Sequence, residues 1–378
     1  MGISARKGVG HIITAKNYVG VISMKDGTTI EIYPKIYSET TDDVNENARV
    51  KKLLVDMLKT LRNAPFKSMQ TANVNIEKMS VFEVFIRMYI DEVFFIVKRG
   101  LKCNYETIQS NENFFKGKLK VSEHIRHNYV HKEKSFVEYD EFNINRVENK
   151  ILKATLQYLY RCSVSMKNRN DIKTLLNYFV EVESSTDYSG DFAKIVPERN
   201  TKDYETALLW SSVFLMGKSF TSFSGSEVAF ALLFPMETLF ESYVAAQLRK
   251  LLKGTEYKLS AQDKSYYLFE QPIKKFQMRP DIVIRNNSAV FIMDTKWKVL
   301  SEGKANYGIS QADMYQMYAY QKKYGASNVT LLYPLTEKVI DKHIEYKSDD
   351  GVIVKVRFVD LYEANVFQSI VIENSFFH

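Results

Sequence analysis

The stretch of sequence that decides the fold is RPDIVIRNNSAVFIMDTK, residues 279–296. It contains two short apolar runs separated by the turn-forming residues 286–288, and each run carries an aspartate at its outer end. Apolar runs of this length joined by asparagine and serine are typical of a β-hairpin. Asp281 and Asp294 are therefore expected at the same end of one pair of strands.

The sequence allows two registers for this hairpin. If it closes symmetrically about Asn287 and Ser288, Asp281 lies directly opposite Asp294, whereas a two-residue loop of Asn286 and Asn287 makes the pair diagonal. Like charges that face each other destabilise a strand pair, so two facing aspartates favour a bound cation. Carboxylate oxygens suit a hard ion such as Mg²⁺. The hairpin thus predicts a magnesium site, with Mn²⁺ as an alternative ion.

Lys296 completes a set of residues that can hydrolyse a phosphodiester. It follows Asp294 by two positions, so the two side chains share one face of the strand. The carboxylates would hold the metal, which lowers the pKa of a bound water, and the lysine would orient that water and stabilise charge. An ordinary ion pair on a surface hairpin is the alternative explanation of the same residues.

The helix expected before the hairpin, residues 233–252, supplies a further acid. Glu241 is expected to support the metal, and Glu237 lies one turn earlier as an alternative. The hairpin and this acid together favour a metal-dependent nuclease over a surface ion pair.

The helix expected after the hairpin, residues 313–324, places Gln316 and Tyr320 one turn apart on one face. Gln316 is expected to belong to the site, where it would position Lys296, contact DNA or bridge backbone groups. Tyr320 is expected to pack in the core.

The predicted elements divide the chain near residue 200. The first forty residues alternate as strands do, and helices are expected at residues 50–61, 80–98, 148–161 and 171–181. Beyond residue 200 the order is helix, hairpin, helix and strand, followed by a further strand within residues 352–361, which predicts a mixed sheet flanked by helices. We expect an α+β domain over residues 1–200 and an α/β domain over residues 201–378.

Composition excludes several classes of protein. Of the 378 residues 45% are hydrophobic and 26% charged, which is typical of a globular protein. Two cysteines cannot support a disulfide framework or a four-cysteine zinc site. The first residues lack the apolar stretch of a secretory signal, and the most apolar run, residues 81–97, carries four charges. We expect a cytoplasmic protein without membrane spans.

The charge balance permits contact with nucleic acid without requiring it. Lysine and arginine number 52 against 45 acidic residues, a net charge of +7. Residues 98–134 hold nine basic and four acidic side chains and so contribute +5 of this excess. We favour a solvated face for that segment, and a phosphate contact or an acidic partner are the alternatives.

The hairpin resembles the PD-(D/E)XK nuclease superfamily, with Pro280-Asp281 as its first half-motif and Asp294-Thr295-Lys296 as its second. A closer resemblance is to the McrC family, the nuclease subunits of McrBC-type modification-dependent (5-methylcytosine) restriction systems. Its motifs are RPD at 279–281, DTKWK at 294–298, DMYQMYAY at 313–320, LLYP at 331–334, EIYPKI at 31–36, YDEF at 139–142 and NKIL at 149–152.

The resemblance implies a fold and a set of roles. The fold is a C-terminal PD-(D/E)XK restriction-endonuclease-like domain preceded by an α+β domain. Asp281, Asp294 and Glu241 would bind Mg²⁺, and Asp281, Asp294, Lys296 and Gln316 would form the catalytic set. The activity is endonuclease cleavage of modified double-stranded DNA in defence against foreign DNA.

The resemblance also implies partners. McrC-like proteins cleave DNA when bound to McrB, an AAA+ GTPase ring whose hydrolysis they stimulate, and their N-terminal half docks into that ring. Cutting both strands needs two active sites, which predicts pairing of nuclease subunits. Residues 217–219, Gly-Lys-Ser, imitate the end of a phosphate loop, but position 212 is serine where the first glycine belongs, so the nucleotide site is expected elsewhere.

Two alternatives remain beside this interpretation. One is a non-catalytic adaptor that activates an NTPase ring. The other is a stand-alone DNA-repair nuclease of the same superfamily, which would cleave without a partner.

Overall fold

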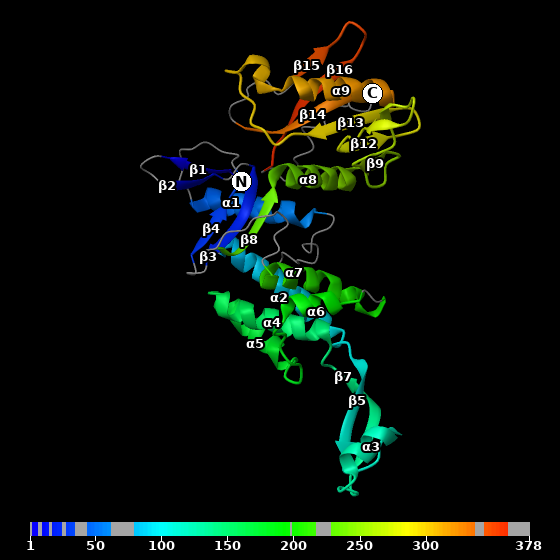
Figure 1. The fold of residues 1–378 in the computed structure, drawn as a ribbon. Helices are drawn as coiled ribbons and strands as arrows, with labels where there is room; N and C mark the ends of the chain where they lie inside the picture. The colour runs from blue at the N-terminus through cyan, green and yellow to red at the C-terminus, as the bar shows by residue number, and fades with distance from the viewer. Residues whose placement is uncertain are drawn as a thin grey trace. The chain divides into compact units, whose positions relative to one another are not determined.

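The computed structural model describes residues 2–6, 10–14, 17–24, 28–34, 44–61, 79–196, 199–216, 228–336 and 344–361. The chain forms two compact units (Figure 1). The first unit contains residues 1–23, 28–81 and 231–378, and the second contains residues 24–27 and 82–230. Residues 217–219, the imitation of a phosphate loop, lie outside the described residues.

This grouping differs from the division expected near residue 200. Strand β3 (Tyr18–Met24) lies between β4 (Thr29–Ile32) and β8 (Val228–Pro235) in a three-stranded sheet, so the N-terminal strands belong with the C-terminal part of the chain. Strand pairing between segments more than 200 residues apart is not visible in local periodicity. The docking role expected for residues 1–200 stays a prediction.

The first unit is built on a mixed six-stranded sheet, and the α/β class is confirmed. Its order is β15-β16-β14-β13-β12-β9, with parallel pairs β13–β14 and β14–β16 and antiparallel pairs elsewhere. Helix α8 contacts β9 and β13 of this sheet, and helix α9 contacts β13, β14 and β16. The elements are α8 (Met236–Leu251), β9 (Lys258–Ala261), β12 (Ile282–Arg285), β13 (Val290–Thr295), α9 (Gln311–Tyr324), β14 (Asn328–Pro334), β15 (Ile344–Lys347) and β16 (Ile353–Val359).

The symmetrical register of the central hairpin is confirmed. β12 and β13 pair with Ile282 opposite Met293, so the next position outward places Asp281 opposite Asp294. The side-chain oxygen of Asn286 accepts hydrogen bonds from the backbone N–H groups of residues 288 and 289 and closes the turn. The turn closed by Asn286 therefore helps to fix the register that places Asp281 opposite Asp294, 13 residues later in the sequence.

The helix expected from residue 233 begins later than predicted. Residues 228–235 form β8, and α8 starts at Met236 after Pro235. The run from Ala231 to Phe234 is buried throughout, and a buried strand shows no alternation by which it can be told from a buried helix. Proline has no backbone N–H to donate to a ladder and its fixed φ suits a helix entry, which explains why the change occurs there.

The second unit combines helices with a small antiparallel sheet, β5-β7-β6. The helices expected at 80–98 and 148–161 are present, the one expected at 171–181 runs from 166 to 177, and α3, α6 and α7 were not singled out. The elements are α2 (Val81–Lys98), β5 (Asn104–Glu112), β6 (Lys118–Leu119), α3 (Val121–Asn128), β7 (Ser135–Asn143), α4 (Val147–Cys162), α5 (Met166–Asn177), α6 (Tyr188–Lys194) and α7 (Glu205–Met216).

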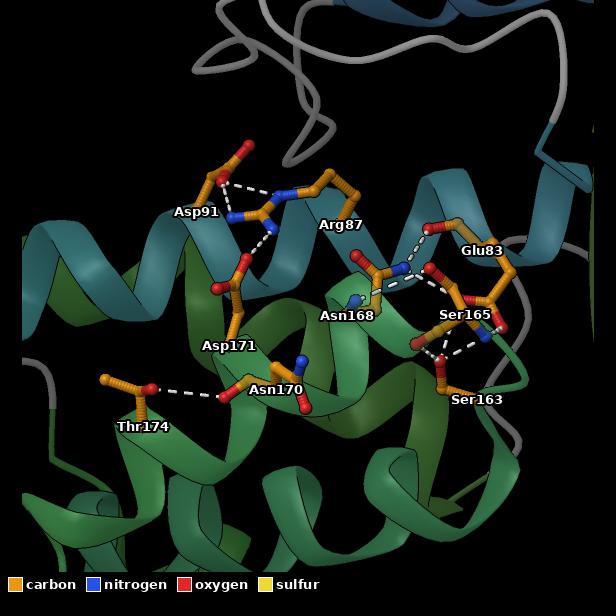
Figure 2. Close-up of polar contacts among 9 residues, drawn as sticks. All are labelled: Glu83, Arg87, Asp91, Ser163, Ser165, Asn168, Asn170, Asp171 and Thr174. Carbon is orange, nitrogen blue, oxygen red and sulfur yellow. Dashed lines mark hydrogen bonds and ion pairs between the residues drawn. The ribbon is translucent and has the colours of Figure 1, made fainter.

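A buried carboxylate fastens α5 to α2 in the second unit. Glu83 on α2 is 3% exposed and accepts hydrogen bonds from the Ser163 hydroxyl, the Asn168 amide and the backbone N–H groups of residues 164 and 165 (Figure 2). Farther along the same two helices, Arg87 bridges Asp91 and Asp171. A buried charge is tolerated only when donors surround it, so these contacts define how α2 and α5 pack.

One further helix, α1 (Val44–Lys59), belongs to the first unit. Helix α1 covers the helix expected at residues 50–61 and contacts α8 within the first unit. Among the described residues, no helix combines the length and apolar character needed to cross a membrane.

Gly20 offers a test of the pairing between β3 and β8. Its φ is +137°, and a Cβ built there would lie 1.9 Å from the carbonyl oxygen of Leu232. We predict that Gly20→Ala lowers the free energy of unfolding by at least about 3 kcal/mol, because the β8 backbone cannot yield as a flexible side chain would. Gly254→Ala is the matched control: its φ is +87° with open space around the Cβ, so its cost is about 1–2 kcal/mol. Equal losses in denaturant unfolding would contradict this close approach.

Candidate active site

All five residues expected from the sequence line one cleft of about 380 Å³ in the first unit. The cleft lies where the ends of β12 and β13 meet α8 and α9. Its lining residues are Glu237, Thr238, Glu241, Arg279, Asp281, Asp294, Thr295, Lys296, Trp297, Lys298, Asp313 and Gln316. Residues separated by up to 79 positions in sequence are thus brought to one place.

The two aspartates at the centre are held in different ways. One oxygen of Asp281 accepts hydrogen bonds from both the backbone N–H and the hydroxyl of Thr295, at 2.8 and 2.7 Å. Asp294 is 2% exposed. Burial and the neighbouring Asp281 raise the pKa of Asp294, and burial raises the pKa of Asp281 against the opposing effect of the Thr295 hydrogen bonds. The pair therefore favours a cation close to both carboxylates.

Lys296 supplies that positive charge. Its Nζ lies 2.7 Å from Oδ2 of Asp294 and 3.4 Å from Oδ1 of Asp313. Burial alone would lower the pKa of Lys296, but Asp294 and Asp313 raise it above its usual value. The lysine is held charged among carboxylates, on the same face as Asp294 as the strand spacing predicts.

Gln316 positions Lys296. Its side-chain oxygen accepts a hydrogen bond from Nζ of Lys296 at 3.2 Å, and its amide donates to the hydroxyl of Tyr320 at 2.7 Å. Tyr320 is 4% exposed and belongs to the core between α9 and the sheet, which confirms its packing role. Of the three roles open to Gln316, the observed contacts favour that of holding the lysine.

Asp313 is a cleft residue that was not predicted as part of the site. It lies in the first turn of α9, where the Ser310 hydroxyl accepts a hydrogen bond from its backbone N–H. The i, i+3 spacing of Asp313 and Gln316 places both on one helix face, and this spacing is the signal that could have identified it.

Gln262 is the second residue that sequence reasoning missed. Its backbone N–H donates to the carbonyl oxygen of Asp281 at 2.8 Å, and its side-chain amide donates to the carboxylate of Glu241. Its φ of +55° is uncommon for a residue with a side chain. Gln262 follows β9, which reaches the site only through pairing with β12, so no local motif marks it.

Glu241 lies in the cleft as an acid with a perturbed pKa. Burial, followed by repulsion from Asp281, raises the pKa of Glu241 to about 7, and the Gln262 hydrogen bond opposes this shift. Glu237, the alternative one turn earlier, also lines the cleft, but its side chain is exposed and accepts a hydrogen bond from Asn17.

The donor set fits a magnesium ion held mainly by two carboxylates. Among the residues that the structure describes, no three histidine, cysteine or acidic side chains are grouped so that they could hold a metal together. Mg²⁺ commonly keeps several waters and uses one or two carboxylates plus substrate phosphates. Asp281 and Asp294 suit such a site, since a cation would offset the charges that burial disfavours. A ligand role for Glu241 stays a prediction.

The raised pKa of Glu241 predicts how stability changes with pH in the absence of metal. Between 4.5 and about 7 the folded state binds more protons at this group than the unfolded state does, so the free energy of unfolding falls as pH rises through this window. Glu241→Gln removes the effect. The variant should melt a few degrees higher than the wild-type protein above pH 7 in a chelator, with little difference near pH 4.5.

Glu237→Gln is the control for this measurement, because it removes an exposed acid from the same helix face. Its melting curve should show no comparable gain above pH 7. A Glu241→Gln protein that is equally or less stable than the wild type across the whole pH range would contradict the burial argument.

Comparisons with known proteins agree with this architecture. A family described as "McrBC 5-methylcytosine restriction system component" matches residues 13–334. A solved half-complex of Thermococcus gammatolerans McrB AAA+ hexamers with bound McrC is similar over 95% of this chain and 80% of that chain, at 20% identity and a TM-score of 0.66. A second structure, the McrBC complex of the same organism, covers 64% of this chain and 68% of that chain, at 19% identity and a TM-score of 0.49. A search among curated proteins found no match. The first structure shows a shared fold. Because the family match spans most of this chain, the chain belongs to the McrBC 5-methylcytosine restriction system component family.

Proposed function

We propose that this chain is the Mg²⁺-dependent DNA endonuclease subunit of a modification-dependent restriction complex, with a PD-(D/E)XK nuclease core in its first unit. The observation that carries the proposal is the position of Asp281 opposite Asp294 with Lys296 in the same cleft. A surface ion pair would not need a second carboxylate, the half-buried Asp281, beside the buried Asp294. The family match supports the restriction context.

The proposed reaction is hydrolysis of a DNA phosphodiester. Bound Mg²⁺ would lower the pKa of a water and offset charge on the phosphate. Asp281 and Asp294 hold the ion, and Thr295 keeps the first of these carboxylates oriented. Lys296 orients the attacking water and stabilises developing negative charge.

The supporting residues keep this arrangement in place. Gln316 and Asp313 hold the lysine ammonium beside the cleft centre. Gln262 ties Glu241 to the backbone next to Asp281. A positioning error of about 1 Å is enough to lower a rate by two orders of magnitude, so these contacts matter for catalysis.

The proposed partner is an McrB-like AAA+ GTPase ring whose hydrolysis the chain stimulates. The similar solved structure contains McrC bound to McrB AAA+ hexamers. In this chain the second unit is a suitable docking region, because its β5, α3 and β7 segments expose large apolar side chains. They are Tyr105, Phe114, Phe115, Val121, Ile125, Tyr129, Val130 and Phe142. Modified double-stranded DNA is the proposed substrate, and pairing of two nuclease subunits would allow both strands to be cut.

The adaptor and the stand-alone nuclease are less well supported by the site. A non-catalytic adaptor would not need two carboxylates, one of them buried, that face and repel each other. A stand-alone nuclease has no use for the exposed apolar surface of the second unit. The cleavage experiment described below distinguishes both alternatives from the restriction subunit.

Replacing Asp294 tests the catalytic part of the proposal. Asp294→Ala should lower DNA cleavage by roughly a hundredfold or more, because it removes one of two metal ligands, while partner binding and stimulation of GTP hydrolysis persist. Asp350→Ala, which removes an exposed acid of the same unit, should cleave as the wild type does. Simultaneous loss of cleavage, partner binding and stimulation would indicate misfolding instead.

The assay uses methylated and unmethylated plasmid with Mg²⁺, incubated with the chain alone and with an AAA+ GTPase ring plus GTP. Cleavage only in the complete mixture supports the restriction subunit. Cleavage by the chain alone would favour the stand-alone nuclease, and stimulation of GTP hydrolysis without cleavage would favour the adaptor.

A further inference from the structure

A small hairpin of the first unit lies a few residues before Asp281 and strand β12 in the sequence. Strands β10 (Tyr267–Phe269) and β11 (Lys275–Gln277) pair antiparallel, with Phe269 opposite Lys275. They form a sheet of their own, separate from the six-stranded sheet. We call residues 264–277 the β10–β11 hairpin.

The β10–β11 hairpin exposes three large apolar side chains. Phe269 is 56%, Ile273 60% and Phe276 70% exposed, and the rings of the two phenylalanines meet edge to face with centroids 6.0 Å apart. Phe276 has a φ of +56°, a backbone region that a bulky residue rarely adopts. A cluster of exposed apolar side chains is typical of a surface that binds a ligand or a macromolecule.

The charges on the same segment indicate what it binds. Lys264, Lys274 and Lys275 are exposed, and Glu270 is the one acid between residues 264 and 277. Nζ of Lys274 lies 5.8 Å from the centroid of the Tyr267 ring. Lysines beside exposed aromatic rings are typical of surfaces that contact phosphates with the cations and bases with the rings.

The hairpin is anchored close to the cleft. The backbone N–H of Met278 donates to the carbonyl oxygen of Tyr266 at 2.9 Å, and the Met278 side chain is buried in the core beneath α9. Arg279 then lines the cleft. Phe276 precedes Asp281 by five residues, so their Cα atoms are at most about 18 Å apart. That span equals roughly five base-pair steps of duplex DNA.

We propose that the β10–β11 hairpin is a DNA-binding element of the nuclease. Phe269, Ile273 and Phe276 contact bases as an apolar wedge, and the three lysines contact the flanking phosphates, within about five base pairs of the cleaved bond. The proposal rests on the proposed nuclease function. DNA is favoured over a second copy of this chain, because a two-fold contact would bring the same lysines together.

The test measures affinity for a short duplex oligonucleotide, in full-length protein carrying Asp294→Ala to prevent cleavage. The Phe269→Ala/Phe276→Ala variant should weaken binding about tenfold. Lys274→Ala/Lys275→Ala should lower the slope of log affinity against log salt by about 2. Tyr318→Ala and Lys347→Ala, exposed positions elsewhere in the unit, are the matched controls and should leave both quantities unchanged.

A crosslinking measurement gives the position on the DNA. A photoreactive benzoylphenylalanine at residue 276 should crosslink to nucleotides within about five base pairs of the cleavage position. Crosslinks only at greater distances would overturn the proposal even if affinity falls.

Other results separate this proposal from the proposed function. If both hairpin variants bind DNA with the affinity and salt slope of their parent protein, and the wild type cleaves DNA, the hairpin proposal is overturned. The proposed nuclease function is then still supported. Reduced self-association with unchanged DNA affinity would identify a contact between copies instead. No duplex binding by the wild type, alone or with its partner ring, would overturn the hairpin proposal, and absence of cleavage as well would overturn both.

Discussion

The repulsion between Asp281 and Asp294 is the constraint on which the site depends. The hairpin register places the two carboxylates opposite each other, and burial raises the pKa of both. Such a pair is unfavourable unless a cation lies beside it. Without metal, the ammonium of Lys296 fills this role from 2.7 Å away. The two carboxylates that repel each other in the fold are the ones proposed to hold a divalent ion.

The surrounding contacts follow from this constraint. In the proposed mechanism Lys296 would move from Asp294 to orient the attacking water, and it would then need other oxygen partners close by. Asp313 and Gln316 on α9 provide them at 3.4 and 3.2 Å. The helix is fixed in turn by the buried Tyr320, which accepts a hydrogen bond from Gln316. Packing of Tyr320 in the core therefore helps to fix the helix that carries these two oxygen partners of Lys296.

The local parts of this account could be predicted from sequence, and the long-range parts could not. The turn residues limited the hairpin to two registers, one of which pairs Asp281 with Asp294 as observed, and helical spacing was enough to place Gln316 with Tyr320. Gln262 was not predicted as a site residue, because β9 reaches the site only by pairing with β12. Strand β8 was not predicted because a buried run shows no alternation. The grouping of the N-terminal strands with the C-terminal part of the chain was not predicted because periodicity describes a segment and not its partner.

The most direct test of the central claim is a crystal structure of the metal-free protein soaked in Mn²⁺, with anomalous scattering used to locate the ion. We expect a manganese peak within coordination distance of both Asp281 and Asp294, with the Lys296 ammonium moved from Asp294 toward Asp313 and Gln316. A cleft without a peak, in which Lys296 stays paired with Asp294 at saturating Mn²⁺, would contradict it.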